Sequence, residues 1–252
     1  MTRLGLISDV HGNVFALDAV LAELEREGID GLICLGDVAA GPQPREALAR
    51  VQELGCPVVM GNWDAWFIER LKPPPPQDEI AVILYEINAF WADQLTADDR
   101  AVLRGYVPQL ELPLDSGEQA LCFHGSPRSY DDFIFATTPD EELAAMLGDV
   151  RRPLLIGGHT HLQLVRRFEH ALFVNPGSVG LPFSDWWPDR VLVAPRAEYG
   201  VLVHEEGQLR VELRRTTYDV EALLRLTLES GMPHAEWWVD CWTDDGRSKI
   251  YT

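Results

Sequence analysis

The chain has 252 residues, of which 46% are hydrophobic and 24% are charged, as is usual for a globular protein in water. Lys and Arg number 21 and Asp and Glu number 40, which gives a formal net charge of −19 at pH 7. This charge argues against a long nucleic acid or an anionic membrane as a partner. It allows a small phosphorylated substrate, because a metal ion can reverse the local field.

The cysteines and the apolar runs predict a cytoplasmic protein. The four cysteines, Cys34, Cys56, Cys122 and Cys241, show no CxxC spacing, so we expect buried thiols in a reducing compartment and no disulfides. The N-terminal apolar run is too short for a signal peptide, and no run reaches the roughly 18 apolar residues of a membrane span. We therefore expect a cytoplasmic location and no membrane partner, while assembly into a homo-oligomer stays open.

Short apolar runs alternate with helical patterns in the first third of the chain. We expect strands at residues 4–7, 31–35 and 58–60. Apolar residues recur at helical spacing from Val14 to Leu24, with Asn13 as the N-cap, and a second helix is expected over 46–54. This alternation predicts a parallel sheet with helices on its faces.

The segment after the third apolar run has a different pattern. Four consecutive prolines at 73–76 predict a loop or a short spacer. Helices are expected over 78–94 and 96–104, the second opened by a capping box of Thr96 and Asp99. We expect these two helices to form a small helical insertion at about 73–107.

The remainder of the chain is rich in strand patterns. We expect strands at residues 109–112, 120–123, 153–156, 162–168, 171–174, 200–204 and 209–214. A turn at 205–207 predicts a hairpin between the last two strands, and a final helix is expected over about 219–229. We predict a single domain over 1–252, with a C-terminal extension at about 219–252.

Polar side chains with metal-binding groups follow five of the apolar runs. These side chains are Asp9 and His11, Asp37, Asn62, His124, and His159 with His161. In open α/β sheets ligands bind outside the carboxyl ends of the strands, so these groups could converge on one pocket. Imidazole together with carboxylate suits Mn, Fe, Zn or Ni. The other three histidines, His170, His204 and His234, are expected to be structural or exposed.

In this order, the motifs resemble those of the calcineurin-like metallophosphoesterases, and most closely their small prokaryotic branch. The motifs are Asp9-x-His11, Gly36-Asp37, Gly61-Asn62-x-Asp64, His124-Gly125 and Gly158-His159-Thr160-His161, and residues 175–180 match that branch's closing turn. The resemblance implies a four-layer α/β-β/α sandwich, in which two mixed sheets are flanked by helices.

The resemblance also implies how the ligands are shared between two metal ions. Asp9, His11 and His161 would hold the first ion, Asn62, His124 and His159 the second, and Asp37 would bridge both. The cofactor is then a pair of divalent transition-metal ions, with manganese favoured over iron, zinc or nickel. The expected catalytic residues are Asp37, Asn62 and His124, and a metal-bridging hydroxide is the expected nucleophile in phosphoester hydrolysis.

Trp63 departs from the pattern of the larger family. Many members have a histidine after the motif asparagine that protonates the leaving oxygen and is oriented by the next acidic residue. Here those positions hold Trp63 and Asp64. An indole cannot act as a general acid, a role that contributes about 10²–10⁴-fold to the rate. Ser8 and Ser126 lack the partners of a catalytic serine and are expected to be structural.

The small prokaryotic branch also tends to lack this histidine, so we expect a phosphodiesterase that acts on a small phosphorylated or nucleotide-like substrate. A phosphomonoesterase or phosphoprotein phosphatase is the first alternative, and a non-enzymatic interaction scaffold on the same fold is the second.

The roles of three tryptophans and two arginines stay open. Trp63 either stacks on a base or aryl group or fills space beneath the site. Trp186 and Trp187 either flank the pocket or form a contact surface. Arg45 and Arg128 either clamp a phosphate or lie in solvent.

Overall fold

The computed structural model describes residues 2–69, 79–114, 117–187, 190–205 and 208–242. Three predicted features lie outside the described residues: the proline loop at 73–76, the hairpin tip at 206–207 and the end of the C-terminal extension at 243–252. The side chains of Trp186 and Trp187 are likewise not described. Within the described ranges, no helix combines the length and the apolar character needed to cross a membrane.

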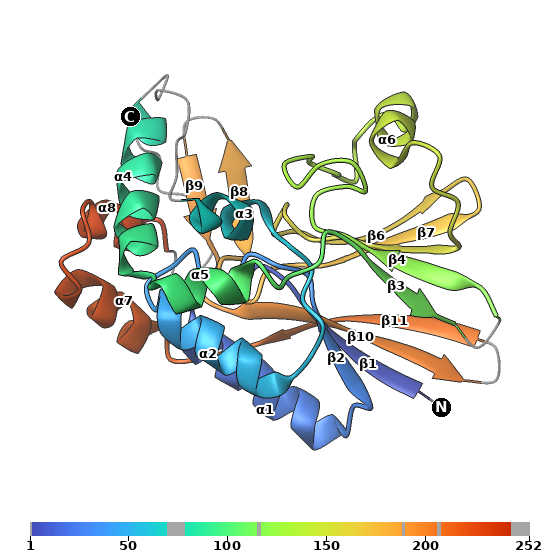
Figure 1. Ribbon diagram of the computed structural model, residues 1–252, viewed down its shortest axis with the longest axis horizontal. Coiled ribbons are helices and arrows are strands. Elements are labelled where there is room, and N and C mark those ends of the chain that lie inside the picture. Colours follow the sequence, from blue (N-terminus) through green and yellow to red (C-terminus); the bar gives the residue numbers. More distant parts are fainter. Residues whose placement is uncertain (1, 70–78, 115–116, 188–189, 206–207, 243–252) are drawn as a thin grey trace.

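Two mixed β-sheets form the centre of the molecule (Figure 1). The first has the order β11-β10-β1-β2 and consists of β1 (Thr2–Ile7), β2 (Gly31–Cys34), β10 (Ala197–Glu205) and β11 (Gln208–Thr216). The second has the order β3-β4-β5-β7-β6 and consists of β3 (Leu110–Pro113), β4 (Gln119–Cys122), β5 (Leu154–Ile156), β6 (Gln163–Phe168) and β7 (Ala171–Pro176). β1 pairs in parallel with β2, and β5 with β4 and β7, whereas the other pairs are antiparallel.

Helices cover the outer faces of both sheets (Figure 1). α1 (Val14–Glu27) and α2 (Pro44–Leu54) lie on the first sheet, and α6 (Asp140–Leu147) lies on the second. On the left of Figure 1 are α3 (Asn62–Ile68), α4 (Glu79–Gln94), α5 (Ala97–Leu103), α7 (Val220–Glu229), α8 (Ala235–Asp240) and a two-stranded ribbon of β8 (Phe183–Trp187) and β9 (Arg190–Val193). The predicted order of layers, helix, sheet, sheet and helix, is confirmed.

The strands contribute side chains to two different cores in alternation. In β1, Leu6 lies in the core between the two sheets, whereas Ile7 belongs to the core on the helix side. In the second sheet, Cys122 faces the first sheet, while Leu121 and Leu155 pack in the core beneath α6. Successive residues of a strand point to opposite faces, so a strand covered on both faces needs a continuous apolar run. This explains the short apolar runs of the sequence.

Most predicted elements are present with ends shifted by a few residues, but the strand predicted at 58–60 is wrong. Val58 makes one isolated bridge to Cys34 and Val59 makes one to Val107, without a continuous ladder. Pro57 has no N–H to donate, and the chain turns at Gly61 into α3, so too few residues remain for regular pairing. α6, α8, β8 and β9 were not predicted.

The predicted helix caps are confirmed. The Asn13 side chain accepts a hydrogen bond from the N–H of Ala16 (3.0 Å), and Thr96 and Asp99 form the expected capping box. The predicted hairpin is also present, because β10 and β11 pair along their whole length.

All four cysteines are free thiols in the structure. Cys34, Cys122 and Cys241 are buried as expected, whereas Cys56 is only half-buried at the end of the loop that follows α2.

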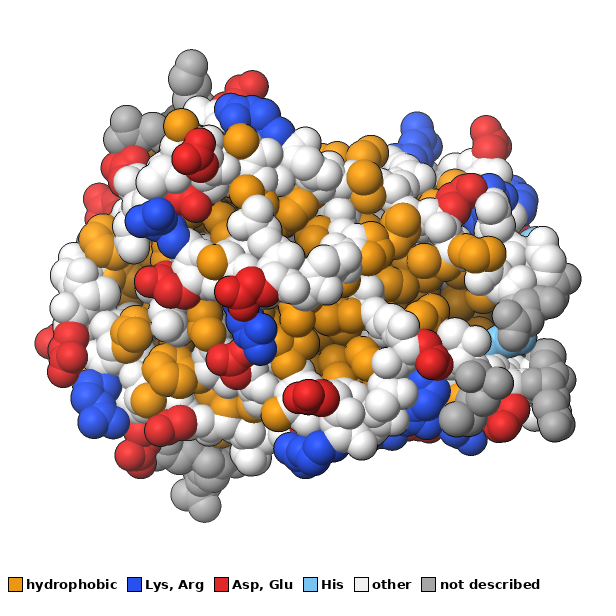
Figure 2. Space-filling view, turned by 60° about the horizontal axis from the view of Figure 1, so that its bottom comes forward, with side chains coloured by type: hydrophobic (Ala, Val, Ile, Leu, Met, Phe, Trp, Pro, Cys, Tyr) orange, Lys and Arg blue, Asp and Glu red, His pale blue; other side chains and the backbone are white. Residues whose placement is uncertain are grey.

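The surface in Figure 2 agrees with the acidic composition of the chain. Hydrophobic side chains form a band across the middle of this face, and charged side chains are scattered around it. Among the described side chains of this face, Lys and Arg do not gather into a continuous patch (Figure 2).

Asp64 ties the loop after β2 to the beginning of α3. Its buried carboxylate accepts hydrogen bonds from the backbone N–H groups of Asp37 (2.7 Å), Val38 (3.0 Å) and Gly61 (3.2 Å). Burial, together with the charge of Asp37, raises the pKa of Asp64 to about 7. Asp64, which has no histidine beside it to orient, therefore serves as a clamp between two loops.

Asp64→Ala should lower the free energy of unfolding by about 3 kcal/mol or more. Three buried N–H groups lose their acceptor, and each such unsatisfied group costs roughly 1–3 kcal/mol. Asp219→Ala is the matched control, since Asp219 accepts one hydrogen bond from Ala222 at the exposed start of α7 and its loss costs about 1 kcal/mol. Urea denaturation in the presence of a chelator measures both; equal losses would contradict the clamp.

Candidate metal centre

The candidate ligands lie on loops at the carboxyl ends of strands from both sheets. Asp9 and His11 follow β1, Asp37 follows β2, His124 follows β4, His159 and His161 follow β5, and Asn62 begins α3. Every one of these side chains is buried, with no residue more than 9% exposed. The structure therefore brings together all the residues that the sequence predicted for the site.

Most of these residues have an unusual backbone conformation. The φ angles are 54° at Asp9, 47° at His11, 52° at Asp37, 67° at His159 and 57° at His161. This left-handed region costs a non-glycine residue about 1–2 kcal/mol. Of the other non-glycine residues that the structure describes, only Glu169 and His234 adopt it. Strain that gathers at one place in this way is typical of functional sites, where the surrounding structure holds it.

Two glycines allow the loops to approach closely. A Cβ atom on Gly61 would lie 2.1 Å from Oδ1 of Asp37, and one on Gly41 would lie 1.6 Å from the carbonyl oxygen of His11. Both distances are far shorter than van der Waals contact. Any side chain at these two positions would therefore push apart the loops that carry the candidate ligands.

The ligand atoms form two adjoining groups. Asp9, His11 and His161 offer atoms that lie within 4.8 Å of one another, and so do Asp37, His124 and His159. Asp37 lies between the groups, because its Oδ2 is 3.4 Å from Nε2 of His124 and 3.8 Å from Nε2 of His11. Oδ1 of Asp9 also reaches both, at 3.2 Å from Nε2 of His161 and 3.8 Å from Nε2 of His124.

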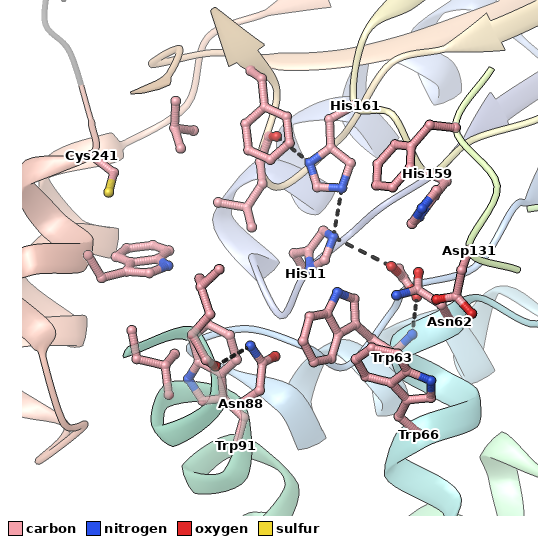
Figure 3. A pocket seen from close by; sticks show the side chains of 18 of the residues that line it. His11, Asn62, Trp63, Trp66, Asn88, Trp91, Asp131, His159, His161 and Cys241 are labelled. Carbon is pink, nitrogen blue, oxygen red and sulfur yellow. Dashed lines mark hydrogen bonds and ion pairs between the residues drawn. The ribbon is translucent and has the colours of Figure 1, made fainter. Parts of the chain in front are cut away.

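Asn62 and the backbone of Trp63 complete the second group (Figure 3). Oδ1 of Asn62 lies 3.2 Å from Nε2 of His124, so the amide oxygen is placed among the imidazole and carboxylate ligands. The N–H of Trp63 donates to Oδ1 of Asp37 (2.9 Å) and holds this carboxylate in place. Trp63 thus supports the site through its backbone, whatever its ring does.

Backbone carbonyls fix the orientation of three of the imidazole rings. Nδ1 donates to a carbonyl oxygen at 2.7–2.8 Å in each of the pairs His11 with Ala40, His124 with Leu35, and His161 with Leu181. Nε2 of each ring is thereby left to face the centre of the site. The Nε2 atoms of His11 and His161 lie 3.0 Å apart, and two lone pairs at this distance repel unless a proton or a cation lies between them.

Unpaired buried atoms provide the test of whether metal ions fit. Oδ1 of Asp9, Oδ2 of Asp37 and Nε2 of His159 have no hydrogen-bond partner in the described part of the chain. A buried carboxylate oxygen without a partner is costly unless a cation is close. Carboxylates, imidazoles and an amide oxygen are also ligands that divalent transition metals accept. The residues present therefore fit a pair of divalent cations.

The histidines differ in their affinity for protons. Burial lowers the pKa of His11 and of His159 to about 4, so both rings are neutral and ready to bind a cation at pH 7. Burial has the same tendency at His124, but the nearby charges of Asp37 and Asp9 outweigh it and raise the pKa of His124 to about 10. In the metal-free protein His124 is therefore protonated, and a metal ion at this position must displace that proton.

The turn at 175–180 holds two of the ligand loops. Nδ2 of Asn175 donates to the carbonyl oxygen of Gly158 (2.7 Å), and Oγ of Ser178 donates to the carbonyl oxygen of Asp9 (2.8 Å). Both side chains are fully buried. The sequence identified this turn only as a motif, and the structure gives Asn175 and Ser178 a positioning role.

Aromatic side chains that the sequence did not single out cover two of the histidines. Phe183 stacks on His161 with ring centroids 4.4 Å apart, and Phe133 lies 4.3 Å from His159. Neither residue has a recognisable spacing from its histidine in the sequence, because Phe183 begins β8 and Phe133 lies in the segment between β4 and α6. The ring of Trp63, half-buried and 4.8 Å from that of Trp66, lines the same cavity as the ligands (Figure 3).

The serines near the site have structural partners. Oγ of Ser8 donates to Oδ2 of Asp9 (2.5 Å), and Oγ of Ser126 donates to Oδ2 of Asp132 (2.6 Å). Neither hydroxyl has a histidine base, in agreement with the structural role expected for both.

The two arginines considered as phosphate clamps are engaged away from the cavity. Arg45 pairs with Asp99 at the surface (2.9 Å), and Arg128 donates to the carbonyl oxygen of Ala145 (3.0 Å). Neither lines the cavity that contains the ligands.

The three histidines left out of the ligand set lie outside both ligand groups. His170 is exposed and His204 is half-buried. His234 pairs with Glu86 of α4 (2.6 Å). These placements agree with the structural or exposed roles expected for them.

Comparison with known proteins agrees with this geometry. The sequence matches the calcineurin-like phosphoesterase superfamily domain over residues 2–194. A protein of Methanocaldococcus jannaschii, described as uncharacterized, is 24% identical over 256 residues, which cover 94% of this chain and 95% of the relative.

Two solved structures are similar along almost the whole chain. A metallophosphoesterase from Sphaerobacter thermophilus is 27% identical, with a TM-score of 0.73 over 95% of this chain and 97% of that one. A hypothetical protein from Pyrococcus horikoshii OT3 shares the fold, with 22% identity and a TM-score of 0.74 over 95% and 98% of the two chains. Because the domain match extends from β1 to β9 and includes every candidate ligand, the chain belongs to the calcineurin-like phosphoesterase superfamily.

Proposed function

We propose that the protein is a phosphodiesterase that uses two divalent metal ions to hydrolyse a small phosphorylated substrate. The observation that carries this proposal is the pair of buried ligand groups, with Asp37 between them. Manganese is the metal we propose, and iron, zinc and nickel accept the same ligands. Hydrolysis of a phosphoester is the activity of the family to which the chain belongs.

Hydrogen bonds within the chain hold the candidate ligands in fixed positions and orientations. Bound at these residues, two divalent cations would neutralise the phosphoryl oxygens and lower the pKa of a water molecule between them. Asp37 is held on one side by the N–H of Trp63 and on the other by the bond from its own N–H to Asp64. The carbonyls of Ala40, Leu35 and Leu181 fix the imidazoles. Groups fixed in this way need little reorganisation during the reaction.

The described residues of the cavity include few groups that could protonate a poor leaving group. Trp63 stands at the sequence position of the general acid, and its indole N–H is too weakly acidic to protonate a leaving group. Beyond the ligands, Asp131 is the one acidic residue among the described residues that line the cavity. Burial and the charge of Asp37 raise its pKa. The proposed reaction therefore suits esters whose leaving oxygen departs with little protonation, and this favours a phosphodiesterase over a phosphatase for stable monoesters.

Replacing a candidate metal ligand should strongly lower the rate of phosphoester hydrolysis without unfolding the protein. With Mn²⁺ and bis(p-nitrophenyl) phosphate, His124→Ala and Asp37→Asn should each lower kcat by at least about 10²-fold, because each removes a group that holds charge at the reacting phosphate. His170→Ala is the matched control, since His170 is exposed in the turn between β6 and β7 and belongs to neither ligand group. Equal activity in all three variants would contradict the proposed function, and no hydrolysis by any metal-loaded form would favour the scaffold alternative.

The rate should fall steeply as the pKa of the leaving group rises. Without a positioned acid, the leaving oxygen must carry its developing negative charge alone. A series of aryl phosphodiesters, measured beside the matching monoesters, gives the slope for each class. A flat response would mean that another group donates the proton, and Asp131→Asn would then show whether that donor is Asp131. Faster turnover of the monoesters would favour the phosphomonoesterase alternative.

Metal binding should be coupled to the loss of about one proton from His124 between pH 7 and pH 9. The pKa of this ring is about 10 in the metal-free protein, so the proton is present throughout this range and must leave when the ring binds a cation. Affinity should therefore rise about tenfold for each pH unit. Titration calorimetry in two buffers with different ionisation enthalpies counts the protons. Affinity that does not change with pH would contradict this coupling.

A further inference from the structure

The ligands open into a single cavity of about 310 Å³, which is within the size range of small-molecule sites (Figure 3). His11, Asp37, Asn62, His159 and His161 line one end of it. From there the cavity extends past Trp63 to Trp91 and Cys241 (Figure 3). A phosphate held at the ligands would therefore place its organic group in the remainder of this cavity.

The remainder of the cavity is largely apolar and aromatic, although Oδ1 of Asn88 and Nε1 of Trp91 have no hydrogen-bond partner among the described residues. Its walls include Trp63 and Trp66 from α3, Leu84, Ile87 and Trp91 from α4, and Trp238 from α8. Ile87 and Trp91 are buried, and the rings of Trp63 and Trp66 meet edge to face with centroids 4.8 Å apart. The consecutive helices α3 and α4 and the distant α8 thus enclose one surface on which an apolar group would be shielded from water.

Charged groups are scarce in this part of the cavity. No Lys or Arg is present among the lining residues within the described ranges, and Asp131 adds a negative charge near Asn62 (Figure 3). Asn88 uses its Nδ2 for the carbonyl oxygen of Leu84 in its own helix (2.7 Å). Among the described residues, a second phosphate or a carboxylate of a substrate would meet no side chain of opposite charge at these walls, and the net charge of −19 opposes its approach.

We infer that the substrate is a phosphoester whose organic group is uncharged and apolar, either an alkyl chain or an aryl ring. This inference rests on the proposed function, because it assigns the phosphate to the candidate metal centre. It narrows the substrate class, since a nucleotide with several phosphates has the wrong charge for the walls around Trp63 and Leu84. Each CH₂ group that enters the cavity should strengthen binding about fourfold until the cavity is full.

The test keeps the leaving group constant and changes only the other ester group. Methyl, hexyl, phenyl and thymidine-5′ esters of p-nitrophenyl phosphate all release p-nitrophenolate, so differences in kcat/KM report on the second group. We expect the hexyl or the phenyl ester to exceed the methyl ester by at least about tenfold. The hexyl and phenyl arms distinguish an alkyl from an aryl substrate. Equal values for all esters, or a preference for the thymidine ester, would overturn the inference.

Variants in α3 and α4 test whether the cavity walls cause this preference. Leu84→Asp places a charge in the apolar wall and should reduce the ratio of hexyl to methyl kcat/KM to near one. Tyr85→Asp is the matched control, because it adds the same charge to the same helix at an exposed residue outside the cavity lining, and it should keep the ratio. Trp66→Ala, at a residue 39% exposed, should lower the phenyl preference without risk to the fold.

Binding without turnover separates this inference from the proposed function. Calorimetry with hexylphosphonate and methylphosphonate on the Mn²⁺-loaded protein should show tighter binding of the hexyl compound with a more negative heat-capacity change. If no ester is hydrolysed, the phosphodiesterase proposal fails, and the phosphonate titration still decides the inference. If the esters are hydrolysed but the two phosphonates bind alike, the inference alone fails.

Discussion

Two carboxylates, Asp9 and Asp37, are buried where the two sheets meet, and the rest of the site is arranged around the need to neutralise them. A buried charge without a counter-charge is very costly. Imidazoles surround the two groups, but one oxygen of each carboxylate keeps no hydrogen-bond partner among the described residues. In the metal-free protein a proton on His124 supplies part of the missing positive charge. A pair of cations supplies it fully, which is why the cluster fits a binuclear centre.

The fold holds this centre in a conformation that an isolated loop would not keep. Five ligands have left-handed φ angles, and together they cost several kcal/mol on the scale of about 1–2 kcal/mol for each. The opposing stabilisation comes from the cores on both sides of each sheet and from polar clamps across loops. Asp64 and the turn with Asn175 and Ser178 are such clamps. Rigidity at the strand ends is therefore a property of the whole sandwich.

The residue pair Trp63 and Asp64 shows how one site can change its chemistry while it keeps its metal ligands. The backbone N–H of Trp63 and the carboxylate of Asp64 both hold Asp37, so these two contacts do not depend on a histidine between Asn62 and Asp64. The indole instead joins an apolar wall with residues from α3, α4 and α8. Loss of an acid and gain of an apolar surface then go together, and both restrict the esters that the site can accept.

The sequence by itself determined the ligand motifs, their order and most helices and strands, because each of these depends on short-range spacing and on which residues follow a strand end. The two-sheet class was implied by the resemblance that these motifs carry. The sequence did not determine the left-handed backbone of the ligands, the clamp by Asp64 or the partners of Arg45 and Arg128. It also missed α6, α8 and β8–β9, and it wrongly predicted a strand at 58–60. Only the tertiary structure decided the shape and polarity of the cavity, since Trp63 and Leu84 in consecutive helices meet Trp238, near the other end of the chain, only after the sheets have packed.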